Sequence, residues 1–279
     1  MIPREAYEYA LKYGPSDKTR KIACKSPEWA YWYAREVDKE LKEDTREAIY
    51  KNSYWLTEYT FSVDKESQAD VRKIMCQYPE SAYYYALLLD KEPRDDTRKA
   101  ACEDPKFAYY YALNIDKKPR NDTRKAVCKT SKWAYKYARD VDKKPREETR
   151  NAACKGPKVA YEYARDIDKC PMDNTREAAC KNQKYAHLYA KYIDQGPRSK
   201  TREAACRDPR WVYWYAKNID KGPHEDTRKA ACKNSESAYN YAIRIEHYPH
   251  EETWMAVKNT EYEEKYRNFF NQIKKDKII

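Results

Sequence analysis

Arginine recurs in this sequence once every 26 residues, in nine places, each time after a threonine or, once, a valine. A guanidinium at fixed spacing can bind phosphate groups, or it can form planar hydrogen-bonded pairs with carboxylates. An equally regular acid accompanies the arginines, as Asp116 accompanies Arg98. Because binding residues in repeat arrays usually vary from repeat to repeat, we expect a structural ladder, with each guanidinium between two carboxylates of neighbouring repeats. The arginines are Arg20, Arg46, Arg72, Arg98, Arg124, Arg150, Arg176, Arg202 and Arg228.

Two tyrosines in most repeats, such as Tyr109 and Tyr111, suggest a second kind of chemistry, because aromatic rings can stack on nucleic-acid bases. Tyr111 falls with Ala108, Ala112 and Ile115 on one helical face, at the spacing i, i+3, i+4 and i+7, which predicts a core position. Tyr109 flanks that face. We expect its ring to pack between repeats and its hydroxyl to find a backbone or carboxylate partner. A base-stacking platform is the alternative for Tyr109.

Eight of the nine cysteines occupy one repeat position, after a short alanine-rich run. Equivalent residues of stacked helices lie roughly 8–10 Å apart, beyond the roughly 7 Å between Cα atoms that a disulfide can bridge. No Cys-x-x-Cys occurs, and no histidine combines with cysteine at zinc spacing. The sequence therefore predicts that these cysteines are small buried apolar residues in a reducing compartment, and it predicts no metal site. The ninth cysteine, Cys170, lies in a loop, where we expect an exposed thiol.

Catalysis is the least favoured function. Only four glycines occur, too few for a loop that cradles phosphate, and no serine, histidine and acid group stands outside the repeat pattern. The histidines occupy variable or loop positions, where we expect them in solvent: His187, His224, His247 and His250. The sequence predicts a protein that is not an enzyme and needs no cofactor.

The net charge of +11 favours an acidic partner, which can be nucleic acid, anionic lipid or an acidic protein face. Charged residues make up 37% of the chain and the mean hydropathy is −1.19. No apolar run approaches the roughly 18 residues of a membrane span, and the first residues contain no signal-peptide core. We expect a soluble cytoplasmic protein that makes no membrane contact.

The pattern of each repeat predicts two short helices. In one repeat the first is expected over about 96–102, with acids in its opening turn. The second is expected over about 105–116, from an Asp-Pro N-cap to a stop before the proline at 119. A strict period of this length predicts stacked units. The predicted fold is all-α, an elongated α-solenoid (superhelix) of about ten helical-hairpin repeats, in one repeat domain: 1–279, with an N-terminal cap at 1–14, tandem repeats at 15–252 and a C-terminal capping helix at 253–279.

The run from Thr97 to Pro105, Thr-Arg-x-Ala-Ala-Cys-x-x-Pro, resembles the signature of short helical repeats of the variant leucine-rich and HEAT-like kind. This resemblance covers most of the chain and implies architecture. Families of this kind mostly bind proteins, and one HEAT-like branch binds DNA as a glycosylase. The Ala-Tyr-x-Tyr-Ala second helix departs from them. Tandem units of that form also resemble repeat proteins carried by bacteriophages, which implies a location in the host cytoplasm and inhibition of a host defence protein.

The position between the paired tyrosines varies between repeats, so the scaffold does not dictate its residue. With residues one turn later it forms an outward stripe on the second helix. Large apolar side chains there predict a protein-binding surface, because exposed apolar patches mark contact sites and Trp and Tyr anchor interfaces. The stripe could instead face the terminal segment or a second copy of the chain. The predicted partner-binding residues are Trp32, Tyr84, Leu88, Tyr110, Leu113, Leu188 and Trp214.

Cations in the loops offer a competing surface. Lysine recurs after the helix-ending acid and arginine follows it closely, so stacking would align them into a basic ridge that can track phosphates. Acids such as Asp95 and Asp96 reduce the positive potential of this ridge. A cation at a helix C-terminus also has an ordinary stabilising role. Binding of RNA or DNA, with tyrosine stacking, is therefore the alternative function. Its residues are Lys91, Arg94, Lys117, Arg120, Lys143, Arg146 and Lys169.

Overall fold

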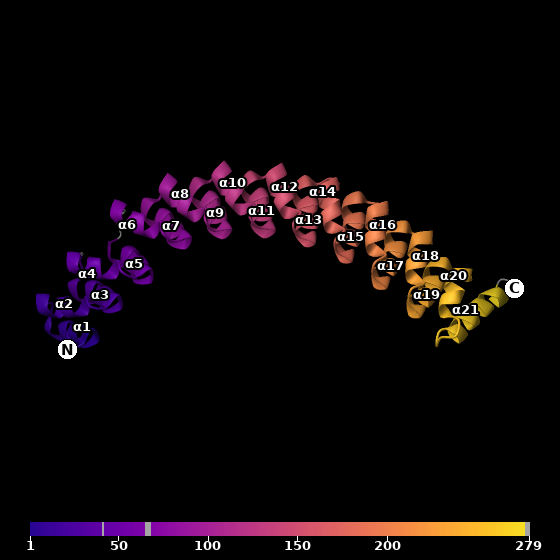
Figure 1. The fold of residues 1–279 in the computed structure, drawn as a ribbon, viewed down its shortest axis with the longest axis horizontal. Coiled ribbons are helices and arrows are strands. Elements are labelled where there is room, and N and C mark those ends of the chain that lie inside the picture. Colours follow the sequence, from indigo (N-terminus) through magenta and orange to yellow (C-terminus); the bar gives the residue numbers. More distant parts are fainter. Residues whose placement is uncertain (41, 65–67, 277–279) are drawn as a thin grey trace. The chain divides into compact units, whose positions relative to one another are not determined.

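The structure of the protein, a computed structural model, describes residues 1–40, 42–64 and 68–276. Within these residues it contains twenty-one α-helices and no β-strand, which confirms the predicted all-α class. The helices fall into two compact units, 1–129 and 130–279. Inside each unit, consecutive helices pair as hairpins and the hairpins stack on their neighbours, as expected of an α-solenoid (Figure 1). No helix in the described part of the chain is both long and apolar enough to cross a bilayer.

The first unit begins with α1 (Pro3–Tyr13), which packs against α2. Four hairpins and one further helix follow. Their helices are α2 (Asp17–Ala23) and α3 (Pro27–Trp32), α4 (Glu43–Ile49) and α5 (Ser53–Tyr59), α6 (Ala69–Met75) and α7 (Pro79–Tyr85), α8 (Asp95–Ala101) and α9 (Pro105–Tyr111), and α10 (Asn121–Val127).

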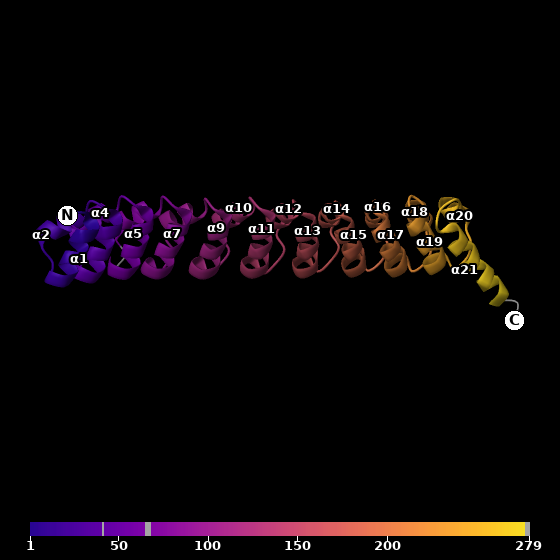
Figure 2. The same cartoon turned by 90° about the horizontal axis from the view of Figure 1, so that it is seen from below.

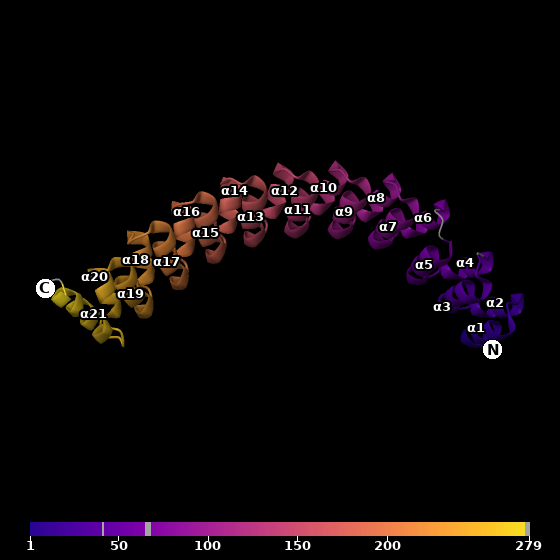
Figure 3. The same ribbon diagram turned by 180° about the vertical axis from the view of Figure 1, so that it is seen from behind.

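The second unit begins with α11 (Ser131–Tyr137) and continues with five hairpins. Its last helix is twice the usual length, at 14 residues. The helices are α12 (Glu147–Ala153) and α13 (Pro157–Tyr163), α14 (Asp173–Ala179) and α15 (Gln183–Tyr189), α16 (Ser199–Ala205) and α17 (Pro209–Tyr215), α18 (Glu225–Ala231) and α19 (Ser235–Tyr241), and α20 (Glu251–Val257) and α21 (Glu263–Asp276). The second helices form one row of the stack, as the views from below and behind show (Figure 2, Figure 3); these are α11, α13, α15, α17 and α19.

The helix starts follow from local chemistry. Helix α8 opens with Asp95 and Asp96, whose charges complement the helix dipole. Helix α9 opens at Pro105, after Asp104 accepts a hydrogen bond from the Lys106 N–H at 2.7 Å. This is the N-cap that the sequence predicts.

Each second helix from α3 to α19 changes to π-helical geometry in its last turn, which the sequence does not predict. These turns, η1 to η9, all end on the recurrent acid: Tyr33–Asp38, Thr60–Asp64, Ala86–Asp90, Ala112–Asp116, Ala138–Asp142, Ala164–Asp168, Ala190–Asp194, Ala216–Asp220 and Ala242–Glu246. After the acid, the Lys91 N–H donates to the Ala86 carbonyl at 2.9 Å. The residue at this position is left-handed, with φ between 52° and 59°, in Lys39, Lys91, Lys117, Lys143, Lys169, Gln195, Lys221 and His247.

In many of the hairpins, one fully buried tyrosine fixes the start of the first helix to the second helix. The Tyr111 hydroxyl lies 2.9 Å from the Thr97 Oγ1, accepts from the Arg94 N–H and donates to the Arg94 carbonyl, both at 3.0 Å. The same group of bonds forms around Tyr163, Tyr189, Tyr215 and Tyr241. The predicted core position is confirmed, and its hydroxyl fixes the start of the first helix to the second.

The other recurrent tyrosine links neighbouring hairpins. The Tyr83 hydroxyl accepts from the Asn114 side-chain amide at 2.7 Å, and the Tyr135 hydroxyl donates to Asp166, also at 2.7 Å. The Tyr83 ring also contacts Phe107 of the next hairpin, with centroids 6.0 Å apart. The expected packing between repeats is therefore confirmed.

The arginine ladder has a different connectivity from the predicted one. Arg98 donates to Asp116 through Nε at 3.0 Å and Nη2 at 2.8 Å, and the exposed fractions of the two side chains are 3% and 0%. This pair joins the two helices of one hairpin, because the π turn brings the acid back to the first helix. The acid of the next hairpin lies farther away, at 4.0 Å from Arg72 and 3.9 Å from Arg228, so the predicted contact between neighbouring repeats is present but longer at these two positions.

Arg46 is different, since it bonds Asp70 of the next hairpin at 2.8 Å. The side chain of Asp64 lies outside the described residues.

Candidate functional site

Two neighbouring second helices of the first unit each contain a run of nine uncharged residues, which begins after Glu80 in α7 and directly after Lys106 in α9. The runs 81–89 (SAYYYALLL) and 107–115 (FAYYYALNI) contain no Asp, Glu, Lys or Arg. They cover most of α7 with η3 and of α9 with η4. The corresponding nine residues of every other 26-residue repeat contain at least one charged residue, such as Arg35 or Glu58. We call this surface the α7–α9 face.

The α7–α9 face is built around the buried Tyr83. Its ring lies between two others, 5.0 Å from the centroid of Tyr84 and 5.9 Å from that of Tyr110. Tyr84 and Leu88, one turn apart on the same helix, are 39% and 47% exposed. Tyr110 and Leu113 are half-buried beside them. The structure thus brings four of the predicted partner-binding residues onto two adjacent helices.

Trp32 belongs to a separate aromatic group in the same unit. It is half-buried, its ring contacts Tyr31 at 5.1 Å, and the Arg35 guanidinium lies 5.4 Å from its centroid. Tyr31 in turn contacts Trp55 at 5.2 Å. Because a cation covers Trp32, this residue offers less free apolar area than Tyr84 or Leu88.

The last two predicted stripe residues lie in the second unit. Leu188 is half-buried on α15, and Trp214 is 48% exposed on α17. Charged neighbours surround Trp214, including Arg210 and Arg244. The stripe is therefore continuous and apolar on α7 and α9 and becomes mixed with charge here.

The loop lysines of the predicted basic ridge are exposed, but their position in the backbone explains their recurrence. Lys91, Lys117, Lys143 and Lys169 are the left-handed residues that end the π turns. A cation there also complements the helix C-terminus. We conclude that a structural role accounts for this lysine without a ligand.

The loop arginines are less available to a ligand than the loop lysines. Arg94 is bonded to Glu92 at 2.7 Å and lies 3.4 Å from the buried Asp90, and Arg120 lies 3.7 Å from Asp122. Arg146 is half-buried. Nearby acids thus contact two of these three arginines directly.

His187 corrects one expectation. It was expected in solvent, but only 5% of its surface is exposed, and its ring packs 5.6 Å from Trp211. Burial, and the nearby charge of Lys191, lower the pKa of His187 to about 4. The register of the repeats could have predicted this burial, because His187 occupies the repeat position of Tyr83 and Tyr161.

Cys180 is buried, but the other seven repeat cysteines are half-buried and thus less enclosed than the sequence predicts, whereas Cys170 is exposed as expected. Burial raises the pKa of Cys102 to about 12 and that of Cys206 to about 11, so both thiols stay protonated and unreactive near neutral pH. Among the described residues, no three His, Cys, Asp or Glu side chains come together in a way that could hold a metal ion.

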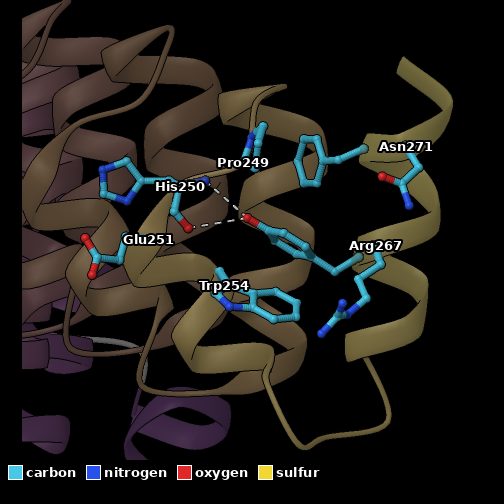
Figure 4. A pocket seen from close by; sticks show the side chains of 8 residues that line it. Pro249, His250, Glu251, Trp254, Arg267 and Asn271 are labelled. Carbon is cyan, nitrogen blue, oxygen red and sulfur yellow. Dashed lines mark hydrogen bonds between the residues drawn. The ribbon is translucent and has the colours of Figure 1, made fainter. Parts of the chain in front are cut away.

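A cavity of about 400 Å³ lies between α20 and α21 (Figure 4). Trp254, Tyr266, Arg267 and Phe270 line it together with the turn at His250. The Tyr266 hydroxyl is held by the His250 backbone, at 3.2 Å from its N–H, as in the other hairpins. Its polar group is therefore already used to close the hairpin.

No protein-family model, no curated protein and no solved structure matches the chain.

Proposed function

We propose that the protein is a non-catalytic binding scaffold that captures another protein through the α7–α9 face. The observation that carries the proposal is the pair of uncharged runs in a chain of which 37% is charged. Cores of protein interfaces are depleted of charge and enriched in aromatic residues. Tyr84 and Leu88 are the exposed anchors, and Tyr110 and Leu113 complete the contact area.

The partner that fits this surface presents an apolar patch of its own. Rigid tyrosine rings provide large contact areas and often carry most of the binding energy. The Tyr83 ring and its bond to Asn114 hold the two helices in place before binding, which reduces the ordering cost. The resemblance to phage-borne repeat proteins makes a host defence protein the first class of partner to test, with inhibition of that protein as the outcome.

The test is retention of a partner from a nuclease-treated extract of the source or host cell. The wild-type chain is compared with a double variant, Tyr84→Ala and Leu88→Glu. We expect the wild type to retain a defined protein and the double variant to retain at least about tenfold less, because the loss of one anchor costs at least about 2 kcal/mol. Circular dichroism checks that both chains are folded.

The matched control alters exposed residues of the same types elsewhere, Leu11→Glu and Tyr248→Ala. These are 55% and 46% exposed, and we expect partner retention to be unchanged. Equal retention by the wild type and the Tyr84/Leu88 variant would contradict the proposal. A wild-type homodimer that the Leu88→Glu change dissociates, seen by light scattering, would instead assign the face to a second copy of the chain.

A further inference from the structure

The second helices α15, α17 and α19 of the second unit present four cations that lack an acidic partner. Lys184, Lys191, Lys217 and Arg244 are exposed, and none of them forms an ion pair with an acid in the described part of the chain. The charges therefore remain available to a ligand.

The earlier second helices of the same unit are different. At the position that Lys191 and Lys217 occupy in η7 and η8, the π turns η5 and η6 carry arginines, and each arginine is neutralised by the aspartate that follows it. The Arg139–Asp140 and Arg165–Asp166 distances are 2.7 Å and 2.6 Å. At this position, cations without an acidic partner are therefore found on η7 and η8 and not on η5 or η6, whereas at the position of Lys184 the exposed Lys106 and Lys132 form no ion pair with the described residues either.

Exposed aromatic rings lie among these cations. Tyr192 and Trp214 are 52% and 48% exposed, and the Lys191 Nζ lies 5.1 Å from the Tyr192 centroid. Lys217 donates to the Tyr213 hydroxyl at 3.2 Å. Although burial acts in the opposite direction, Lys217 and Arg244 lower the pKa of Tyr213, as expected beside a positive surface.

Two grooves of about 570 Å³ each lie on either side of Trp214. One lies towards α19 and includes Ser237, Asn240 and Arg244 in its lining. The other lies towards α15, and its lining includes two side-chain amides and a cation, Asn182, Gln183 and Lys184. Each groove therefore combines an aromatic wall, hydrogen-bonding groups and a positive charge.

The acids of this face are few. Asp208 is bound by Arg210 at 2.9 Å, and Glu236 lines the groove towards α19. Asp194 and Asp220 lie beneath the surface and are paired with arginines of the first helices. The four unpaired cations thus outnumber the exposed acids.

We propose that this face, the α15–α19 face, binds single-stranded nucleic acid. Bases would stack on Trp214 and Tyr192, phosphates would lie along Lys184, Lys191, Lys217 and Arg244, and the amides would contact base edges. Stacking combined with a positive groove is the usual mode of single-strand binding, and exposed base edges suit amide donors and acceptors. An apolar protein patch fits less well, because Trp214 is surrounded by polar groups, unlike the rings of the α7–α9 face.

The test is fluorescence anisotropy with labelled 20-nucleotide oligo(U) and oligo(dT) at several salt concentrations. We expect binding by the folded full-length chain and about tenfold weaker binding after Trp214→Ala, the loss of one stacked base. The Lys191→Glu/Lys217→Glu variant should bind more weakly and show a salt slope smaller by about 1.4, since each phosphate contact to a single strand contributes about 0.7. A duplex of the same length should compete less well.

Two matched controls decide between the surfaces. The first, Lys117→Glu/Lys143→Glu, makes the same charge change in the loops. The second, Tyr84→Ala, removes an exposed ring from the α7–α9 face. Both variants should bind the oligonucleotides like the wild type. The proposal is overturned if no oligonucleotide binds at 50 mM salt, if Trp214→Ala binds like the wild type, or if the loop variant is weakened as much as the helix variant. Displacement of the oligonucleotide by an equal concentration of poly-glutamate would overturn it too, and assign the face to an acidic protein.

Discussion

At the residue scale, a buried tyrosine hydroxyl makes the same polar contacts in one hairpin after another. In the hairpin of α12 and α13, the Tyr163 hydroxyl lies 2.9 Å from the Thr149 Oγ1 and 3.1 Å from both the N–H and the carbonyl of Arg146. A first helix of seven residues cannot be stable alone. The tyrosine therefore substitutes for helix length by fixing the first turn to the neighbouring helix.

Removing that hydroxyl should weaken one hairpin. We expect Tyr163→Phe to lower the free energy of local unfolding of α12 and α13 by about 1–3 kcal/mol, because a buried backbone N–H loses its partner. Hydrogen–deuterium exchange is the suitable measurement, since repeats open locally and contact mainly their neighbours. The exposed Tyr192→Phe is the control. Equal exchange in the two variants would show that the hydroxyl contributes nothing.

His187 should make the second unit sensitive to acid. The unfolded side chain has a pKa of about 6.5, and the buried one a pKa of about 4, so the unfolded state binds more protons between these values. Stability is therefore complete above about pH 6.5 and is lost as the pH falls towards 4, by about 3 kcal/mol in total. Urea unfolding at a series of pH values measures this.

The matched variant is His187→Tyr, which restores the residue found at this position in α7 and α13. We expect the stability of this variant to fall less than that of the wild type between pH 6.5 and 4. The same pH dependence in both chains would mean that other groups cause the acid sensitivity.

At the scale of the elements, a left-handed residue follows the π turn at eight described positions and sets the direction of the chain into the next helix. L-residues other than Gly, Asn and Asp rarely adopt this conformation, which costs roughly 1–2 kcal/mol. Lysine nevertheless holds the position in six of the eight described cases. The favourable charge at the helix C-terminus offsets part of this cost.

Glycine at this position should stabilise the protein. We expect Lys117→Gly, at a φ of 52°, to raise the free energy of unfolding by about 0.5–1 kcal/mol, because glycine adopts positive φ without steric cost. Lys118→Gly, one residue later and outside the left-handed region, is the control and should be neutral or slightly destabilising. Thermal unfolding compares the two. A lower midpoint for Lys117→Gly than for Lys118→Gly would show that the lysine charge outweighs the backbone strain.

The sequence predicted the helical pairs because caps, prolines and apolar spacing act locally. Residues 105–116 were correctly expected to form one helical segment that ends at Asp116. The π turn was missed because it arises from tertiary contacts, namely the return of Asp116 to Arg98. The closer pairing within one hairpin, as between Arg98 and Asp116, was not predicted for the same reason, since a regular spacing does not tell which of two equivalent acids lies nearer.

The candidate site was partly predictable. The variable position between the tyrosines identified Tyr84 and Tyr110, whose exposure follows from helical periodicity. Trp214 has charged neighbours and Tyr84 lies in an uncharged run. That difference did not follow from the pattern, because it depends on which cations on neighbouring helices lack a partner.

At the scale of the whole molecule, the two units carry different surfaces on their second helices. In the first unit, the α7–α9 face is uncharged and aromatic. In the second, the α15–α19 face combines rings with unpaired cations. We propose that one scaffold uses its variable positions for two ligand classes, so that salt should weaken oligonucleotide binding strongly and protein capture only weakly.

The most direct test of the central claim is site-specific photocrosslinking at position 88, with a benzophenone amino acid in place of Leu88. In nuclease-treated extract we expect one defined protein adduct from position 88 and none from position 11, an equally exposed leucine on α1. The same adduct from both positions, or none from position 88 in the extract of the source cell, would contradict the assignment of the α7–α9 face as the surface that captures a protein.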